Sequence, residues 1–358
     1  MNAPFRPAPL TLRLAALAEG DERAALNRFL AAQADATPFH RPEWIEAAAR
    51  GTGNKPLTLL AERDGAIAGC LPLLDVQSPL FGRVFVSSGF GVGGGILADS
   101  EAAAEALVEG AEELAMRNSC PTIELRGGFL PRDRAGWKVR TDSHCGFVCD
   151  LAQDDEAQLL AIPRKQRAEV RKGLGMDLTV SVGTSAADRA AHYRVYCESV
   201  RNLGTPVFPR RLFDEVLDAF GADADILTVS HQGQPVASVL SLYHQGAVMP
   251  YWGGGTWDAR RLRANDRMYY ELMLHARRRG CTRFDFGRSK TGSGPYDFKR
   301  NWGFEPQPLG YASWTAPGAE ARDADPTSAK HAARIALWKR LPLPVANLVG
   351  PFIARGLA

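Results

Sequence analysis

The first half of the chain alternates short apolar runs with turn residues in a pattern that predicts paired strands. "PLTLLAERDGAIAGCLPLL" contains two apolar runs separated by Asp-Gly, which is the composition of a tight hairpin. A third short run, "GRVFVSS", follows, and a glycine run occupies positions 93–95. The pattern then changes to helical spacing over "SEAAAEALVEGAEELAMRNSC", before a last apolar strand, "PTIELRGG". This order of elements predicts an α+β unit with a helix packed on a mixed sheet.

The second half of the chain repeats this order. "DILTVSHQGQPVASVLSLY" predicts another hairpin, and "GAVMPYW" with glycines at 253–255 predicts the third strand. The helix "RLRANDRMYYELMLHARRRGC" and the strand "TRFDFGRS" complete the second copy. Gly65 corresponds to Gly233, and Cys120 corresponds to Cys281. Because several elements match in the same order, the sequence predicts an internal duplication.

The duplicated unit is similar in its order of elements to the acyltransferase fold called GNAT. We therefore expect two tandem GNAT-like α+β domains, with mixed sheets and packed helices. The polar segment "DLAQDDEAQ" interrupts the apolar runs between them. The expected divisions are 1–152 for the first domain and 153–316 for the second domain, which carries the active site. Residues 317–358 are expected to form a flexible linker and an amphipathic tail.

Composition places the chain among globular proteins and locates its positive charge. The 358 residues are 45% hydrophobic and 23% charged, which suits two ordinary soluble domains. The net charge of +3 is unevenly distributed, since residues 1–150 hold 15 basic and 19 acidic side chains and the remainder holds 28 and 21. The basic second half predicts an anionic partner such as a phosphorylated small molecule, RNA or lipid headgroups.

Several classes of site find no support in the sequence. No apolar stretch is long enough to span a bilayer, and the first residues lack the apolar core of a secretory signal, so we expect a cytoplasmic protein. The six cysteines lack zinc-ligand spacing, and no metal site is expected. The loop that cradles the CoA pyrophosphate has only near misses, such as Arg277 to Gly280. We therefore expect no bound cofactor.

A dense cationic segment, "IPRKQRAEVRKG", lies between the two copies. At helical spacing Arg164, Arg167 and Arg171 share one face, which can hold phosphate oxygens. The alternative is a solvated helix face. The following segment predicts two helices joined by a loop, "NLGTP", which we expect to form a wall of the binding cleft, with Tyr196 on the preceding helix as a substrate contact.

The segment "FDFGRSKTGSGPYDFKRNWGFEP" carries the candidate catalytic residues. Asp285 lies in a strand between two phenylalanines, so its carboxylate needs a partner, such as Arg288 or the start of the next helix. That helix should begin at the Gly-Ser-Gly-Pro turn and project Lys299 from its second turn, with Tyr296 and Arg300 beside it.

Two interpretations of this segment remain open. In the first, the cation of Lys299 neutralises an oxyanion as an amine attacks an ester carbonyl, and Asp285 or water removes the proton of the amine. In the second, Lys299 and Arg300 are exposed helix cations and Asp285 is a structural acid.

These segments together resemble the FemAB family of peptidyltransferases. The duplicated unit, the basic helix, the "FDFG" strand and the "PYDFKRNWGFEP" ending carry the resemblance, from about Phe39 onward. "FHRPEWIEA", "NLGTPVFPRRLF" and the tail resemble more narrowly the FemAB-like proteins of PEP-CTERM/exosortase and exopolysaccharide loci.

The resemblance implies transfer of an amino acid from aminoacyl-tRNA to an amine of a peptidoglycan precursor. It maps a lysine that stabilises the tetrahedral intermediate onto Lys299. It also maps contacts with a phosphorylated acceptor onto Arg164, Arg167 and Arg171. A polysaccharide precursor is an alternative acceptor, because Gram-negative peptidoglycan generally lacks peptide bridges. An acyl-CoA-dependent N-acyltransferase and a non-catalytic module for polysaccharide assembly are alternative functions, and DNA is not an expected partner.

The tail "LWKRLPLPVANLVGPFIARGLA" pairs a tryptophan and cations with an apolar segment broken by proline. Such a segment can lie in the interface of a membrane, on the inner face of the cytoplasmic membrane in this case. Packing against the body of the protein and contact with a second copy are the alternatives.

Overall fold

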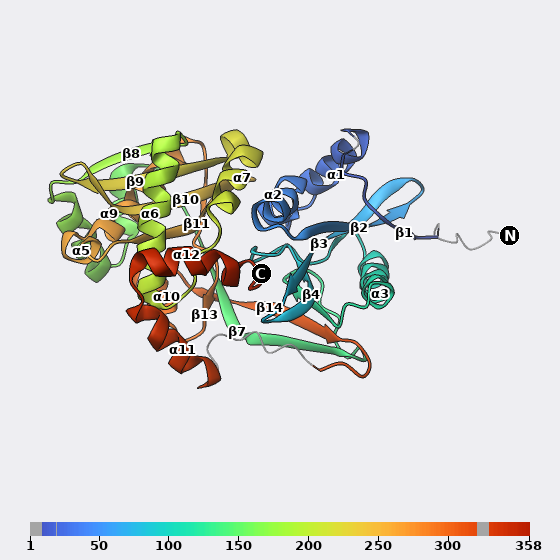
Figure 1. Cartoon of the computed structure of the whole chain (residues 1–358). Helices are drawn as coiled ribbons and strands as arrows, with labels where there is room; N and C mark the ends of the chain where they lie inside the picture. Colours follow the sequence, from blue (N-terminus) through green and yellow to red (C-terminus); the bar gives the residue numbers. More distant parts are fainter. Residues whose placement is uncertain (1–8, 19, 321–328) are drawn as a thin grey trace. The chain divides into compact units, whose positions relative to one another are not determined.

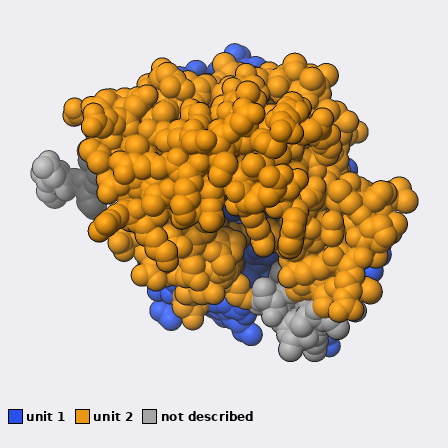
Figure 2. All heavy atoms as spheres, turned by 90° about the vertical axis from the view of Figure 1, so that its left-hand side faces the viewer, with its two compact units in different colours: residues 1–141, 310–324, 356–358 blue, residues 142–309, 325–355 orange. Residues whose placement is uncertain are grey.

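The computed structural model describes residues 9–18, 20–320 and 329–358, with residues 329–334 by their backbone alone (Figure 1). The chain forms two compact units, which are coloured separately in Figure 2. Unit 1 comprises Met1–Thr141, Gly310–Ala324 and Gly356–Ala358, and unit 2 comprises Asp142–Leu309 and Asp325–Arg355. The expected linker between the second domain and the tail falls largely on residues 321–328, outside the described residues.

Unit 1 is a mixed sheet with helices packed on it. Its strands follow the order β1-β2-β3-β4-β6-β14, and a short strand β5 also pairs with β3. The strands are β1 (Thr11–Leu14), β2 (Lys55–Arg63), β3 (Ala66–Ser78), β4 (Gly82–Ser87), β5 (Leu97–Ala98), β6 (Thr122–Arg126) and β14 (Pro306–Thr315). The helices are α1 (Gly20–Ala32), the short η1 (Pro38–His40), α2 (Pro42–Thr52) and α3 (Glu101–Arg117).

The predicted hairpin and return strand of the first copy are present in unit 1. Asp64 and Gly65 both have positive φ, 54° and 75°, and this is the backbone that a tight hairpin turn between β2 and β3 requires. β4 and β6 are parallel, with α3 as the connection, and α3 buries Leu107 and Val108 against the sheet. β14 follows the strands of unit 2 in the sequence, yet it belongs to this sheet and pairs antiparallel with β6.

Unit 2 is built on a second mixed sheet with the order β7-β12-β11-β10-β9-β8, and β13 also pairs with β7. The strands are β7 (Trp137–Asp150), β8 (Thr179–Gly183), β9 (Ala224–His231), β10 (Gln234–His244), β11 (Ala247–Gly255), β12 (Arg283–Asp285) and β13 (Ser289–Lys290). The helices are α4 (Asp155–Ala161), α5 (Arg164–Leu174), α6 (Ala186–Leu203), α7 (Arg210–Phe220), the short η2 (Gly221–Asp223), α8 (Ala259–Leu262), α9 (Ala264–Arg278), α10 (Gly294–Asn301), α11 (Ala329–Arg340) and α12 (Leu343–Ala354).

The helices α6 and α9 both contact β9, β10 and β11, and they cover opposite faces of this sheet (Figure 1). Along β10, Ser238 faces α6 and shares a hydrogen bond with His192 at 3.0 Å. Its neighbours Ala237 and Val239 belong to the core that includes Met268 of α9. Successive residues of a strand point to opposite faces, and the two helices therefore cover two separate layers of side chains.

The expected fold class is confirmed: each unit is an α+β assembly, and the hairpin, third strand, helix and return strand recur in order. The turn at Gln232 and Gly233 has φ values of 51° and 74°, which repeat those of the first hairpin. The expected division at residue 152 falls just after β7, whose residues are shared between the two units. That division stays a prediction.

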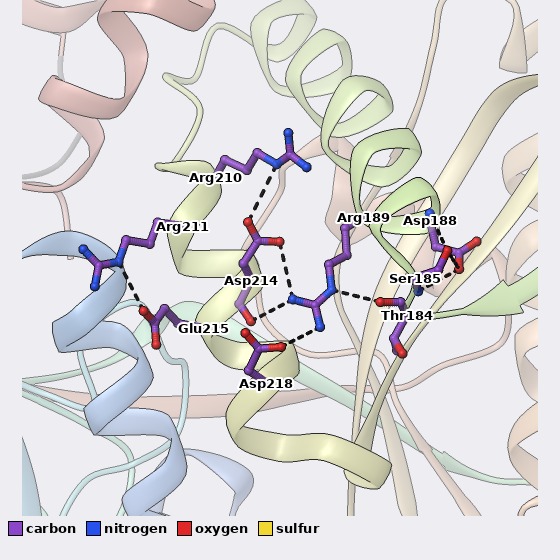
Figure 3. A network of polar contacts seen from close by, with 9 residues as sticks. All are labelled: Thr184, Ser185, Asp188, Arg189, Arg210, Arg211, Asp214, Glu215 and Asp218. Carbon is purple, nitrogen blue, oxygen red and sulfur yellow. Dashed lines mark hydrogen bonds and ion pairs between the residues drawn. The ribbon is translucent and has the colours of Figure 1, made fainter.

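A polar network joins α7 to α6 (Figure 3). The guanidinium of Arg189 on α6 donates to the carboxylate of Asp218 at 2.6 Å and to the carbonyl of Thr184 at 2.9 Å. Asp214 lies between Arg189 and Arg210, at 3.7 Å from each. The network holds α7 against the helix that covers one face of the sheet.

Among the described helices, none is long and apolar enough to cross a membrane.

The glycine run at the end of β11 allows α6 to approach the sheet. A Cβ atom added to Gly254 would lie 2.6 Å from the Cβ of Ser199 on α6, which is closer than real side chains come. A Cβ on Gly253 would lie 2.8 Å from Val239 on β10. Glycine is needed at these two positions because it has no side chain, which allows the neighbouring elements to pack closely, and not because of its backbone flexibility.

We expect Gly254→Ala to lower the free energy of unfolding by about 1–3 kcal/mol, because α6 must move away from β11. Urea unfolding measures this change. Gly294→Ala is the matched control, since nothing lies within 4 Å of a Cβ added there. An alanine at 254 that unfolds like the wild type would show that the two elements are less closely packed.

Candidate functional site

The candidate site lies where two parallel strands of unit 2 separate. β11 and β12 are paired only at Ala247 with Arg283 and at Val248 with Phe284. Beyond that point β11 continues to Gly255, whereas β12 ends at Asp285. The described residues show no strand pairing between the two segments from there on. The carboxyl ends of separating parallel strands are a common place for a ligand.

Asp285 marks the end of β12 and shapes the turn that follows. One carboxylate oxygen accepts the N–H of Gly287 at 2.8 Å, and no other partner of this carboxylate is found among the described residues. Gly287 has φ of +68°, a backbone conformation that favours glycine. Phe284 and Phe286, on either side of the aspartate, are buried in the core. The alternation expected from the sequence therefore directs the carboxylate away from that core.

Lys299 reaches this turn from α10 and is only 8% exposed. Its ammonium nitrogen Nζ donates to the carbonyl oxygens of Gly287, at 3.1 Å, and Arg288, at 2.9 Å. The helix that presents it begins as predicted, with Ser293 as its N-cap and Pro295 in the first turn. The second interpretation of the sequence, an exposed lysine, does not describe Lys299 in this structure.

Aromatic rings surround the ammonium group. Nζ lies 5.3 Å from the ring centre of Phe147 on β7 and 5.5 Å from that of Phe286. Tyr296 packs edge-on against Phe147, and Phe298 packs against Phe286. Cation–π attraction stabilises the charged lysine here, while the rings exclude the water that would solvate it.

Burial dominates the titration of both candidate catalytic groups. It lowers the pKa of Lys299 from 10.5 to about 7, with the charge of Asp285 raising the pKa and that of Arg288 lowering it. Burial also raises the pKa of Asp285, and the Gly287 N–H and the charge of Lys299 oppose that change. The pKa of Lys299 therefore lies near neutral pH, and the pKa of Asp285 lies above that of an ordinary aspartate.

Three other predicted residues lie around this pair. Arg288 is half-buried, and its main chain accepts the hydrogen bond from Lys299. Tyr296 is half-buried on α10, and the guanidinium of the exposed Arg300 lies 5.9 Å from the centre of its ring. All three thus come from the turn and the helix that carry Asp285 and Lys299.

The basic helix α5 packs on α9, and most of its cations face solvent. Its buried face carries Gln166, whose amide donates to the carboxylate of Asp266 on α9 at 2.6 Å. Arg164 and Arg171 are exposed, and no ion pair of theirs is found among the described side chains. One N–H group of the Arg167 guanidinium is already used, because it donates to the carbonyl of Leu160 at 3.1 Å.

The helix α5 begins close to the turn after α10. A Cβ added to Gly303, which follows α10, would lie 3.0 Å from the ring of Pro163, the N-cap of α5. The amino end of α5 is therefore beside the helix that carries Lys299.

Tyr196 lies apart from this group. It is buried on α6, with its ring 5.2 Å from that of Phe213 on α7 and 5.9 Å from that of His192. Burial raises its pKa above the ordinary value of 10. Since α6 covers the sheet face opposite α9, whose Tyr269 packs on α10, the structure does not bring Tyr196 to Lys299.

Two groups at the site escaped the sequence analysis. Phe147 belongs to β7, whose pairing with β12 joins residues far apart in the sequence. The carbonyl acceptors of Lys299 are backbone atoms, which leave no trace in the residue type. The one local signal was Gly287 directly after the "FDF" strand, since glycine there indicates a turn with positive φ.

We expect Lys299→Met to raise the free energy of unfolding near pH 6 by about 1–3 kcal/mol, after the loss of two hydrogen bonds is counted. The lowered pKa means that the folded protein binds this proton less tightly than the unfolded chain does. The loss of folding stability caused by the buried charge is complete below about pH 7 and fades as the pH rises toward 10.5. The extra stability of the methionine variant over wild type should shrink over the same pH range.

Urea unfolding of wild type, Lys299→Met and Arg300→Met from pH 6 to pH 10 measures this effect. Arg300 is the control, because it is exposed on the same helix. A methionine variant that is less stable than wild type near pH 6 would mean that Lys299 serves chiefly to hold the turn.

Comparisons with known proteins bear on the fold of the units that carry this site. A family model described as an acetyltransferase (GNAT) domain matches residues 162–300, which include the basic helix, Asp285 and Lys299. A search of curated protein sequences finds no match.

Similar solved structures extend over most of the chain. The crystal structure of FemX is 16% identical, covers 82% of this chain and 96% of its own, and has a TM-score of 0.66. A tandem GNAT protein from the clavulanic acid biosynthesis pathway is 13% identical, with coverages of 87% and 100% and a TM-score of 0.57. The C-terminal domain of a putative lysylphosphatidylglycerol synthetase from Agrobacterium fabrum is 15% identical, with coverages of 83% and 92% and a TM-score of 0.56. The chain therefore has a tandem GNAT fold like that of FemX, and residues 162–300 match the model of a GNAT acetyltransferase domain.

Proposed function

We propose that this acyltransferase moves an aminoacyl or related acyl group to an amine of a cell-envelope precursor. The observation that carries the proposal is Lys299, a buried ammonium group fixed by two carbonyls at the point where β11 and β12 separate. The Fem-like fold and the likeness to a lysylphosphatidylglycerol synthetase domain support an acceptor or product of the envelope. The precursor itself, from peptidoglycan or an exopolysaccharide, is part of the proposal.

The proposed reaction is a direct attack without a covalent enzyme intermediate. The acceptor amine forms a bond to the carbonyl carbon of the donor ester, and the carbonyl oxygen takes up the negative charge. Collapse of the tetrahedral intermediate re-forms the carbonyl, breaks the bond to the leaving oxygen and yields an amide. The amine loses one proton in the process, and the leaving oxygen gains one.

Lys299 is the proposed stabiliser of that oxyanion. Two of its three ammonium N–H groups are held by the carbonyls of Gly287 and Arg288, which leaves one donor for the reacting oxygen. The aromatic rings exclude water, and a charge at this position therefore acts through a poorly screening medium.

Asp285 is the proposed acceptor of the amine proton. Its raised pKa makes it a better base than a surface carboxylate, and only one of its oxygens is committed to the turn. Because the charges of Asp285 and Lys299 interact, loss of the lysine proton should raise the pKa of the aspartate further.

The cations of α5 are proposed to hold the phosphate groups of the acceptor. Arg164 and Arg171 are exposed and offer guanidinium forks, which suit phosphate oxygens. Arg288, Tyr296 and Arg300 are proposed to contact the substrate nearer to Lys299.

A second candidate function is acyl-CoA-dependent N-acylation. It is favoured by the match to a GNAT acetyltransferase model and by the N-terminus of α9, where the N-cap residue Arg263 makes no side-chain capping hydrogen bond. The missing pyrophosphate motif weighs against it. Transfer assays should therefore offer aminoacyl-tRNA with a UDP-linked peptide precursor in one arm and acetyl-CoA with amino sugars in the other. Activity in neither arm, with binding of envelope glycans, would favour a non-catalytic module.

We expect Lys299→Ala to lower kcat by at least about tenfold, because the oxyanion loses its charged donor. Arg300→Ala, on the same helix but exposed, should mainly raise KM. Steady-state kinetics in the productive arm, with circular dichroism to confirm folding, test both. Turnover that is unchanged in Lys299→Ala would remove Lys299 from the mechanism.

We expect a bell-shaped dependence of kcat/KM on pH. Activity should rise as Asp285 loses its proton, at a pH above the ordinary range of an aspartate, and fall as Lys299 loses its proton near pH 7. Asp285→Asn should remove the acidic limb together with much of the activity. A rate that climbs steadily through pH 7 to 9 would contradict a role for the charged lysine and indicate that the neutral amine is the active form.

A further inference from the structure

The helix α12 turns its large apolar side chains to solvent. Val345, Leu348, Val349 and Phe352 are 43%, 70%, 39% and 66% exposed. Their spacing of three, one and three residues places them on one face of the helix. A soluble protein rarely leaves such a row of side chains uncovered, because burying it is favourable.

The opposite face of α12 carries small residues and packs on the body of unit 2. Ala346 and Ala354 are buried, and Gly350 lies between them at helical spacing. A Cβ added to Gly350 would lie 3.0 Å from both the backbone nitrogen and a methyl group of Val207, in the loop after α6. The close approach leaves no room for a larger side chain on this face. The orientation of the helix is therefore determined by its small residues.

The preceding helix, α11, packs on α6, as α12 does (Figure 1, where both helices are red). A Cβ added to Gly204 would lie 2.6 Å from a methyl group of Ile335 and 3.0 Å from the Cε of Lys339. Arg201 of α6 donates to the carbonyl of Lys339 at 3.3 Å. α6 and the loop after it thus hold both helices, while Leu337 of α11 is 65% exposed.

The exposed apolar face of α12 is flanked by positive charge. Lys339 and Arg340, at the end of α11, are exposed, and so is Arg355 just after α12. No Asp or Glu occurs between residues 326 and 358. A surface that complements this segment must therefore be apolar at its centre and negatively charged at its margin.

An anionic lipid surface has both properties, and a second copy of the chain has only one. In a twofold contact the same patch meets itself, and the cations of one copy would face those of the other. α12 is 12 residues long, about 18 Å, and cannot cross a hydrocarbon core of about 30 Å. A helix of this kind lies in the plane of the interface.

We propose that α12 docks unit 2 on an anionic membrane surface, with Leu348 and Phe352 in the acyl boundary and Lys339 and Arg340 at the headgroups. The proposal is independent of the acyl-transfer chemistry, because none of these residues belongs to the candidate site. It commits to a lipid surface as the occupant of this face.

Co-sedimentation with vesicles tests the proposal on the full chain. Wild type should bind vesicles of phosphatidylcholine with roughly 30% phosphatidylglycerol and bind phosphatidylcholine alone at least about tenfold more weakly. The double variant Leu348→Ser with Phe352→Ser should lower the bound fraction by at least about tenfold on the anionic vesicles. Leu80→Ser is the matched control, because Leu80 is 68% exposed in unit 1, and it should bind as wild type does.

A charge variant provides a second, separate readout. Lys339→Gln with Arg340→Gln should remove the preference for anionic lipid and the sensitivity to salt, with the fold unchanged. Wild type that binds neither kind of vesicle overturns the proposal, as does equal binding by the double serine variant. Light scattering that shows a dimer in wild type and a monomer in that variant would assign this face to a second copy instead.

Discussion

The burial of one ammonium group, that of Lys299, constrains the turn between β12 and β13 in unit 2. The carbonyls of Gly287 and Arg288 hold Lys299 where water is excluded, and two aromatic rings complete its surroundings. A charge in such a place costs stability, and only partial compensation comes from Asp285. The turn between β12 and β13 is fixed from both sides, by the carboxylate of Asp285 and by the lysine.

The sequence predicted the parts of the fold that local chemistry determines. The Asp64–Gly65 and Gln232–Gly233 turns were recognisable because few residues tolerate positive φ at both positions. The start of α10 was recognisable from Ser293 and Pro295, whose roles at a helix N-terminus need no tertiary context. Lys299 and Asp285 were both identified as catalytic candidates within one segment, residues 284–306.

The remainder depends on contacts between distant segments. Phe147 joins the site because β7 pairs with β12, and no local pattern around residue 147 specifies that pairing. Tyr196 was assigned to the cleft from its position before a loop, but the sheet face that a helix covers is decided by the whole unit. The buried face of α5 likewise follows from the pair of Gln166 with Asp266, which are a hundred positions apart.

The return of β14 to the sheet of unit 1 has a consequence for how the chain is made on the ribosome. Arg126 of β6 pairs with Tyr311, so residues 142–309 of unit 2 are synthesised before β6 can acquire this neighbour. Until then the nascent first unit exposes an open sheet edge, the kind of surface on which other strands aggregate. Gene fragments that stop between the two hairpins would leave that edge permanently open. A chaperone that shields nascent strands would therefore benefit the first unit more than the second.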